Sequence, residues 1–330
     1  MRKSVFTLCL LLVWSVVVLA DDPVESTSTA TITFFRTPSS LLPGIFSVSE
    51  TKRVSFARGN LQYLASQNLW RFAEHQYDFI GNAVGNTTAE AYRATQGNWI
   101  DYFGWGTSGW SGGDNYSHNT YQPWAISTTN SHYGPTLAHM AAEHNWAESA
   151  STKNYDWGVY NFTSGPDKGY YVMSKEEWEY LLETRDPAGN ENALTLKGQG
   201  AVFGITGLFL LPDNWDWTEA TIAAAVTAAG FTWTAGSATY VNNRIRDDAD
   251  GHTLWEAMEA AGAVFLPATG YFQNGATVSI GDQARYHTST VKSAEYMYAL
   301  DWKNGTLVYV DPTCSRALGR SVRLAKTITE

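Results

Sequence analysis

The amino-acid sequence predicts an α+β fold that is built from many short strands and few helices. Short apolar or alternating runs recur along the chain, but they lack the regular strand–helix alternation of a parallel α/β protein. Only 16% of the 330 residues are charged, and 28 glycines mark frequent turns. This composition is typical of a loop-rich globular protein rather than of a helical bundle or a disordered chain.

The first 20 residues have the three parts of a secretory signal peptide. A positive start at Arg2 and Lys3 precedes an apolar run over residues 5–19, and Ala20 ends the segment before an acidic pair. A membrane anchor is the alternative, but this run is short for a bilayer span, which needs about 20 residues. We therefore expect an exported protein, whether secreted, periplasmic or held at the cell surface, with no transmembrane segment.

The next segment, residues 21–50, is rich in serine and threonine and contains three prolines. We interpret it as a flexible lead-in with one short strand at residues 31–35. No change of composition divides the chain after residue 51, so residues 51–330 are expected to form a single domain.

Strands are predicted at residues 54–56, 61–63 and 69–72, where apolar and polar residues alternate between turn signals. Residues 81–135 then lose all periodicity and are rich in glycine, asparagine and aromatic residues. A loop of this length inside a compact domain is usually functional. A short helix is expected over residues 136–149.

The sequence predicts three further helices. The first spans residues 174–185, because Ser174 and Glu177 have the spacing of a capping box and Pro187 prevents continuation. The second runs from Thr218 to Ala229, and the third begins at Thr253; both end at glycines.

Apolar strands are expected next to these helices, at residues 202–205, 208–211 and 263–266. Near the C-terminus, alternating aromatic residues over 296–302 lead to Asn304-Gly305, a dipeptide typical of hairpin turns. The hairpin should return over residues 307–310, and a last strand is expected at residues 320–324.

Several short motifs occur in an order that resembles a known family. They are Tyr155–Gly158, Ser174–Tyr180, Leu210–Asp213, Phe265–Tyr271 and Gly319–Leu324. In this the chain resembles secreted paralogous proteins of Bacteroidetes-type bacteria, which are similar to the formylglycine-generating (sulfatase-modifying) enzymes. The resemblance implies a C-type lectin-like fold with short, mostly antiparallel strands and three or four helices.

The enzymes of that family use a pair of cysteines that hold copper. After removal of the signal peptide, which contains Cys9, this chain has Cys314 alone. We therefore expect no formylglycine-generating activity and no cofactor, although the acidic segment from Asp247 to Asp250 leaves a structural calcium ion open. We interpret that segment as the cap of the following helix.

The net charge of −10 argues against a nucleic-acid partner, since phosphates require clusters of lysine and arginine. Tryptophans in the loops, such as Trp105, Trp110, Trp124, Trp215 and Trp217, could either stack on a ligand or fill the core. In lectin-like folds the ligand face lies near the C-terminal sheet, and the resemblance places it between residues 271 and 316. The candidate ligand-binding residues there combine aromatic and polar side chains: Gln273, Asn274, Arg285, Tyr286, His287, Lys292, Glu295, Tyr296 and Trp302.

These observations favour a non-enzymatic binding protein whose ligand is a glycan or another protein. Two alternatives stay open. One is an extracellular enzyme, either a divergent oxidase or a polysaccharide hydrolase, and the other is a structural component of a surface appendage or matrix.

Overall fold

The computed structural model describes residues 6–10, 14–18, 40–64, 67, 69–83, 86, 97–105, 156–162, 164–187, 193–273, 276–293, 296–316 and 318–329. The chain divides into two compact units, residues 1–39 and 40–330. In the first unit, β1 (Phe6–Leu10) pairs with β2 (Trp14–Val18) in antiparallel orientation. Among the described residues, no helix is long and apolar enough to cross a membrane.

The second unit begins at Ser40, so part of the predicted lead-in belongs to the folded domain. Strand β3 (Phe46–Ser47) pairs with β4 (Arg53–Phe56), and the side chain of Phe46 is fully buried. Residues 40–50 therefore do not belong to a flexible segment, contrary to the prediction for residues 21–50. The strand expected at residues 31–35 lies outside the described residues.

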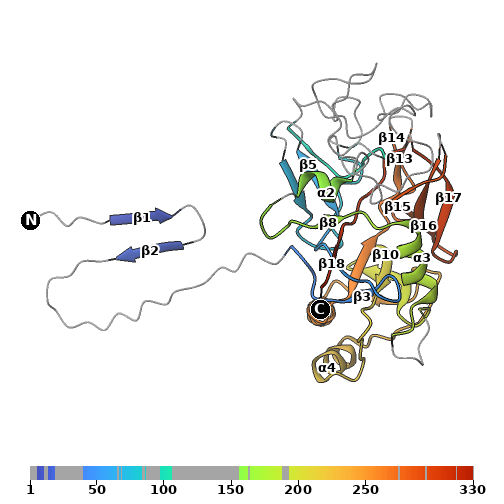
Figure 1. The fold of residues 1–330 in the computed structure, drawn as a ribbon. Coiled ribbons are helices and arrows are strands. Elements are labelled where there is room, and N and C mark those ends of the chain that lie inside the picture. Colours follow the sequence, from blue (N-terminus) through green and yellow to red (C-terminus); the bar gives the residue numbers. More distant parts are fainter. Residues whose placement is uncertain are drawn as a thin grey trace, which may run out of the picture. The chain divides into compact units, whose positions relative to one another are not determined.

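The second unit is α+β, as predicted, with small sheets and long connections (Figure 1). Strands from both ends of the unit share one four-stranded sheet, in which β4 pairs with β18 (Ala325–Thr327) and β18 pairs with β8 (Tyr170–Tyr171). A three-stranded sheet has the order β6 (Leu69–Phe72), β5 (Leu61–Leu64), β7 (Trp99–Ile100). These strands confirm the three predicted between residues 54 and 72.

A second four-stranded sheet has the order β11 (Arg244–Ile245), β9 (Lys197–Val202), β10 (Ile205–Leu210), β12 (Val264–Pro267). Helices α4 (Ala220–Ala229) and α5 (Ala249–Ala260) contribute Ala225 and Leu254 to a core with Phe209 and Phe265 of this sheet. Apart from β11 with β9, the strand pairs in the described part of the chain are antiparallel.

The strand predicted over residues 202–205 is wrong, because a turn lies inside it. Val202 and Ile205 face each other across the β9–β10 hairpin, and the two residues between them have positive φ angles, 52° for Phe203 and 85° for Gly204. A two-residue turn of this kind matches the twist of the strands it connects. The turn could not be predicted from the sequence, because phenylalanine is unusual at the first position of a two-residue hairpin turn.

The C-terminal part contains a hairpin, β13 (Tyr271–Gln273) with β14 (Ala276–Val278), and a sheet of β15 (Gln283–Val291), β16 (Tyr296–Lys303) and β17 (Tyr309–Ser315). The turn predicted at Asn304-Gly305 is present, since Thr306 N donates to Lys303 O at 2.9 Å. The return strand begins at Tyr309 rather than at residue 307. Residues 320–324 make isolated bridges through Arg320 and Ser321, so the last strand begins later than predicted.

The helix predicted at residues 174–185 is confirmed as α3 (Lys175–Glu179) and a π-helical turn, η3 (Tyr180–Thr184). Both hydrogen bonds of the capping box between Ser174 and Glu177 are present. Helix α2 (Trp157–Asn161) begins at Asp156, whose carboxylate accepts from the backbone of Gly158. The helix predicted at residues 136–149 lies outside the described residues.

Helix α4 ends at Gly230, as predicted, with a left-handed φ of 59°. Helix α5 begins four residues earlier than predicted, because Asp248 accepts from Gly251 N at 2.8 Å and caps the first turn. The interpretation of the acidic segment as a helix cap is thus confirmed, and only the starting residue changes.

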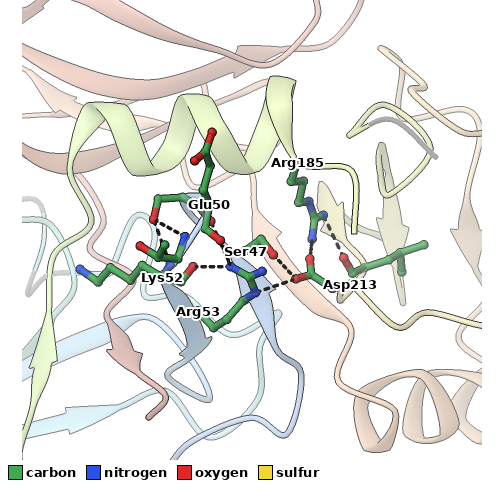
Figure 2. Close-up of polar contacts among 9 residues, drawn as sticks. Ser47, Glu50, Lys52, Arg53, Arg185 and Asp213 are labelled. Carbon is green, nitrogen blue, oxygen red and sulfur yellow. Dashed lines mark hydrogen bonds and ion pairs between the residues drawn. The ribbon is translucent and has the colours of Figure 1, made fainter. Parts of the chain in front are cut away.

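A half-buried carboxylate, Asp213, connects η3 to the sheet that contains β3 and β4 (Figure 2). It accepts from Arg185 Nη1 at 3.0 Å and from the hydroxyl of Ser47, and it lies 3.9 Å from Arg53 Nε. Burial lowers the pKa of Arg185 to about 10, but this arginine stays charged at neutral pH. The contacts hold β3, β4 and the end of η3 together.

Aromatic side chains fill much of the interior. Trp105, Trp157, Trp178 and Trp302 are fully buried. Trp215 and Trp217 pack against the core of the second four-stranded sheet. Trp110 and Trp124 lie outside the described residues. Of the five loop tryptophans that could either bind a ligand or fill the core, three therefore pack in the core: Trp105, Trp215 and Trp217.

Candidate functional site

The structure separates the predicted ligand-binding residues into buried and accessible groups. Tyr286, His287 and Trp302 are at most 1% exposed. Gln273 and Arg285 are half-buried, and Lys292 and Tyr296 are exposed. Asn274 and Glu295 lie outside the described residues.

The three buried side chains belong to the core. Tyr286 stacks on Trp302 with ring centroids 5.7 Å apart, and its hydroxyl donates to Pro267 O at 3.0 Å. His287 Nε2 lies 2.6 Å from Phe103 O, and burial lowers the pKa of its imidazole well below the ordinary value. A ligand on the surface cannot reach these groups, so we remove them from the candidate site.

Arg285 belongs to a polar cluster on the face of the same sheet that lies opposite to Tyr286 and Trp302. Its Nε lies 2.6 Å from Asp301 Oδ2, and Gln283 Nε2 donates to the other oxygen of Asp301 at 2.9 Å. Asp311 and Cys314 complete the cluster, with Cys314 Sγ 3.3 Å from Asp311 Oδ2. One potential ligand atom each from Asp301, Asp311 and Cys314 lie within 4.8 Å of one another.

This cluster fits a metal ion poorly. The guanidinium of Arg285 already balances Asp301, and a second cation would be repelled by it. Burial raises the pKa of the Cys314 thiol to about 11, which favours the protonated form over the thiolate that binds metals. We interpret these residues as a buried polar network that joins β15, β16 and β17.

A different region forms an open groove with a volume of about 550 Å³. Three segments far apart in the sequence line it: the loop after β6, the turn between β9 and β10, and the end of the β14–β15 connection. The lining residues are Tyr77, Asp78, Phe79, Ile80, Gly81, Asn82, Phe203, Ile205 and Ile280. None of these residues is among the candidate ligand-binding residues predicted from the sequence.

Four aromatic rings contact one another in succession at the groove. Tyr77 meets Phe203 edge to face with centroids 5.3 Å apart. His75 stacks on Tyr77 at 5.1 Å, and His252 stacks on Phe203 at 3.9 Å. Each histidine also contacts a carboxylate, Asp78 in one case and Asp247 in the other. These contacts fix the planes of the two rings that face the groove.

Polar groups accompany the rings. Asp78 Oδ2 accepts from the backbone and the ring of His75, at 2.9 Å and 3.0 Å. Its Oδ1 accepts no hydrogen bond from the described residues. The carbonyl oxygen of the Asn82 side chain accepts from Thr277, and the amide nitrogen donates no hydrogen bond within the described part of the chain. The groove thus offers an acceptor and a donor beside its aromatic surface.

A buried carboxylate, Asp101, fixes the loop after β6 that lines the groove. Asp101 accepts from Ile80 N at 2.7 Å and from Asn86 Nδ2 at 2.6 Å, and Asn86 also donates to Gly81 O at 3.0 Å. Burial raises the pKa of Asp101 to about 6, although these hydrogen bonds oppose the shift. The loop is therefore fixed at two successive residues, Ile80 and Gly81.

Backbone strain places one of the groove rings. A left-handed conformation destabilises a residue other than glycine by roughly 1–2 kcal/mol. Phe203 adopts it, with φ of 52°, at the tip of the β9–β10 hairpin. Strained residues of this kind are concentrated at functional sites, where the surrounding structure maintains them. The ring of Phe203 is half-buried and is one of the groove's lining residues.

Comparison of the chain with protein-family models, with curated proteins and with solved structures found no match.

Proposed function

We propose that the protein is a non-enzymatic binding protein whose ligand is a glycan held in the groove between Tyr77 and Phe203. The observation that carries the proposal is an open groove in which half-buried aromatic rings lie beside an acceptor and a donor that make no hydrogen bond with the described residues. Its volume of about 550 Å³ lies in the usual range for small-ligand sites.

The composition of the groove suits sugars. Aromatic faces provide apolar surface for the C–H groups of a pyranose ring, and their polar neighbours can bind its hydroxyl groups. Tyr77 and Phe203 are oriented by their histidine partners, so little side-chain entropy is lost when a ligand binds. Preorganised rings of this kind favour recognition.

The same groove offers weaker support for hydrolysis. Glycosidases typically use two carboxylates that face each other across the scissile bond at about 5–10 Å. Among the described residues that line the groove, Asp78 is the only carboxylate. The enzyme alternative would require a second acid on the opposite wall.

The wider setting of this proposal follows from the sequence. We propose a C-type lectin-like fold and an exported protein, on the basis of the motif order and the signal-peptide pattern. The α+β arrangement of small antiparallel sheets is compatible with that fold. A structural role in a surface appendage remains the second candidate.

The first test is a glycan array with the purified protein, with and without calcium, followed by titration of the strongest hits. Tyr77→Ala should weaken binding by up to about ten-fold, since an aromatic contact is worth about 0.5–1.5 kcal/mol. Tyr309→Ala is the matched control, because Tyr309 is an exposed tyrosine on β17 that does not line the groove.

Two results would contradict the proposal. One is the absence of glycan binding under both conditions, which together with self-association would favour the structural role. The other is a loss of binding in Tyr309→Ala with normal binding in Tyr77→Ala, which would return the site to the C-terminal sheet.

A further inference from the structure

The groove has an acidic environment. Asp78 lines it directly, and Asp247 lies behind the Phe203 ring through its contact with His252 at 2.9 Å. Two further carboxylates, Glu74 and Glu259, are close enough for their negative charges to raise the pKa of Tyr77. The pKa of the Tyr77 phenol is raised by burial and, in turn, by Asp78, Glu259, Asp247 and Glu74.

Asp78, which lines the groove, and Asp247, which contacts His252 behind the Phe203 ring, each keep one free carboxylate oxygen. Asp78 uses Oδ2 for both hydrogen bonds with His75, and Asp247 uses Oδ1 for His252. The second oxygen of each carboxylate accepts nothing from the residues that the structure describes. Both side chains are accessible, at 39% for Asp78 and 71% for Asp247.

The nearby arginines form no ion pair with Asp78 or Asp247 in the described part of the chain. Burial lowers the pKa of Arg71, although this arginine is close enough for the charges of Glu74 and Asp78 to oppose the shift. Arg71 lies over the ring of Trp99 at 3.7 Å and donates to Gln62 at 2.8 Å. Arg246 is paired with Asp248 at 2.7 Å. Neither arginine lines the groove. The cations that pair with Asp78 and Asp247 among the described residues are His75 and His252, which are charged only when protonated, so negative charge at the groove is available to a ligand when these histidines are neutral.

We propose that the groove selects a glycan that carries a positive charge, namely one containing protonated amino sugars without acetyl groups. This inference rests on the proposed function and specifies its ligand class. An ammonium group can pair with Asp78 Oδ1 while the faces of Tyr77 and Phe203 attract the cation and pack on the sugar ring. A neutral sugar would pack on the two rings but would form no ion pair with Asp78.

The test compares three oligosaccharides of equal length: β-1,4-linked glucosamine, N-acetylglucosamine and glucose. Titration calorimetry at pH 6 should show glucosamine oligomers binding at least ten-fold more tightly than the other two. The difference should shrink at high salt, because exposed charges are screened.

The variant Asp78→Asn removes the charge and keeps an oxygen that can accept from His75. We expect it to lower affinity for glucosamine oligomers about ten-fold and to leave affinity for the neutral oligomers unchanged. Glu176→Gln is the control, because Glu176 is an exposed carboxylate on α3 that does not line the groove.

The possible failures are distinguishable. Equal affinity for all three oligomers, reduced by Tyr77→Ala, would overturn the charge selection and leave the glycan-binding proposal intact. Preference for glucosamine that Asp78→Asn does not change would also overturn the inference. No binding of any oligomer, charged or neutral, on this panel or on the array would contradict the glycan-binding proposal itself.

Discussion

The buried carboxylate of Asp101 makes the stability of the domain depend on pH in a direction that can be calculated. Its pKa rises from 3.8 to about 6 on folding, because burial disfavours the charged form. Between these two values the folded protein holds a proton that the unfolded chain has lost. The stabilisation is therefore complete below pH 3.8 and is lost as pH rises through 6.

The size of the effect follows from the shift. About two pKa units, at about 1.4 kcal/mol each, correspond to about 3 kcal/mol. Asp101→Asn removes this titration. The amide nitrogen of the new side chain cannot accept a hydrogen bond, so one of the two bonds that Asp101 accepts is lost, but this loss changes stability equally at every pH. Other groups, including Asp156 with its pKa raised to about 7, titrate in both proteins and cancel.

The assay is urea unfolding of both proteins, followed by tryptophan fluorescence from pH 3.5 to 7.5. The unfolding free energy of the wild type, relative to that of Asp101→Asn, should fall by about 2.5 kcal/mol between pH 4 and pH 7. A difference that stays constant over this range would refute the reasoning, because it would mean that Asp101 is solvated or differently paired.

Three further predictions concern the fold. Gly251→Ala should lower the unfolding free energy by about 1–3 kcal/mol in denaturant titrations, because its Cβ would lie 1.9 Å from the backbone oxygen of Arg246. The control Gly97→Ala should leave this free energy unchanged, because no atom of the described residues, apart from its chain neighbours, lies within 4 Å of the new methyl group. Ser174→Ala should lower the same free energy by about 1 kcal/mol through loss of the cap on α3, whereas a Thr at this position should largely restore it. Cys314, which is buried and protonated, should react slowly with a thiol reagent in the native protein and rapidly in urea; rapid native labelling would contradict its placement.

Local signals in the sequence were sufficient for elements whose ends are set by neighbouring residues. The capping box of Ser174 and Glu177 predicted α3, and Gly230 predicted the end of α4. The start of α5 was missed because two residues could act as caps, and Asp248 rather than Thr253 does so.

The groove could not be predicted from the sequence, because its walls come from residues 77–82, 203–205 and 280. No periodic pattern joins these segments, and Phe203 at a left-handed position contradicts the usual turn residues. At the C-terminal sheet the alternation of residues was recognised, but it does not say which face is buried. The structure places Tyr286 and Trp302 toward the core and Arg285 on the other face.

The location of the bound glycan tests the central claim most directly. Hydrogen exchange measured by mass spectrometry, with and without the strongest-binding oligosaccharide, reports which backbone amides the ligand protects. We expect protection in peptides that cover residues 75–82 and 203–206. Protection confined to residues 271–316, with none in the groove segments, would contradict the account.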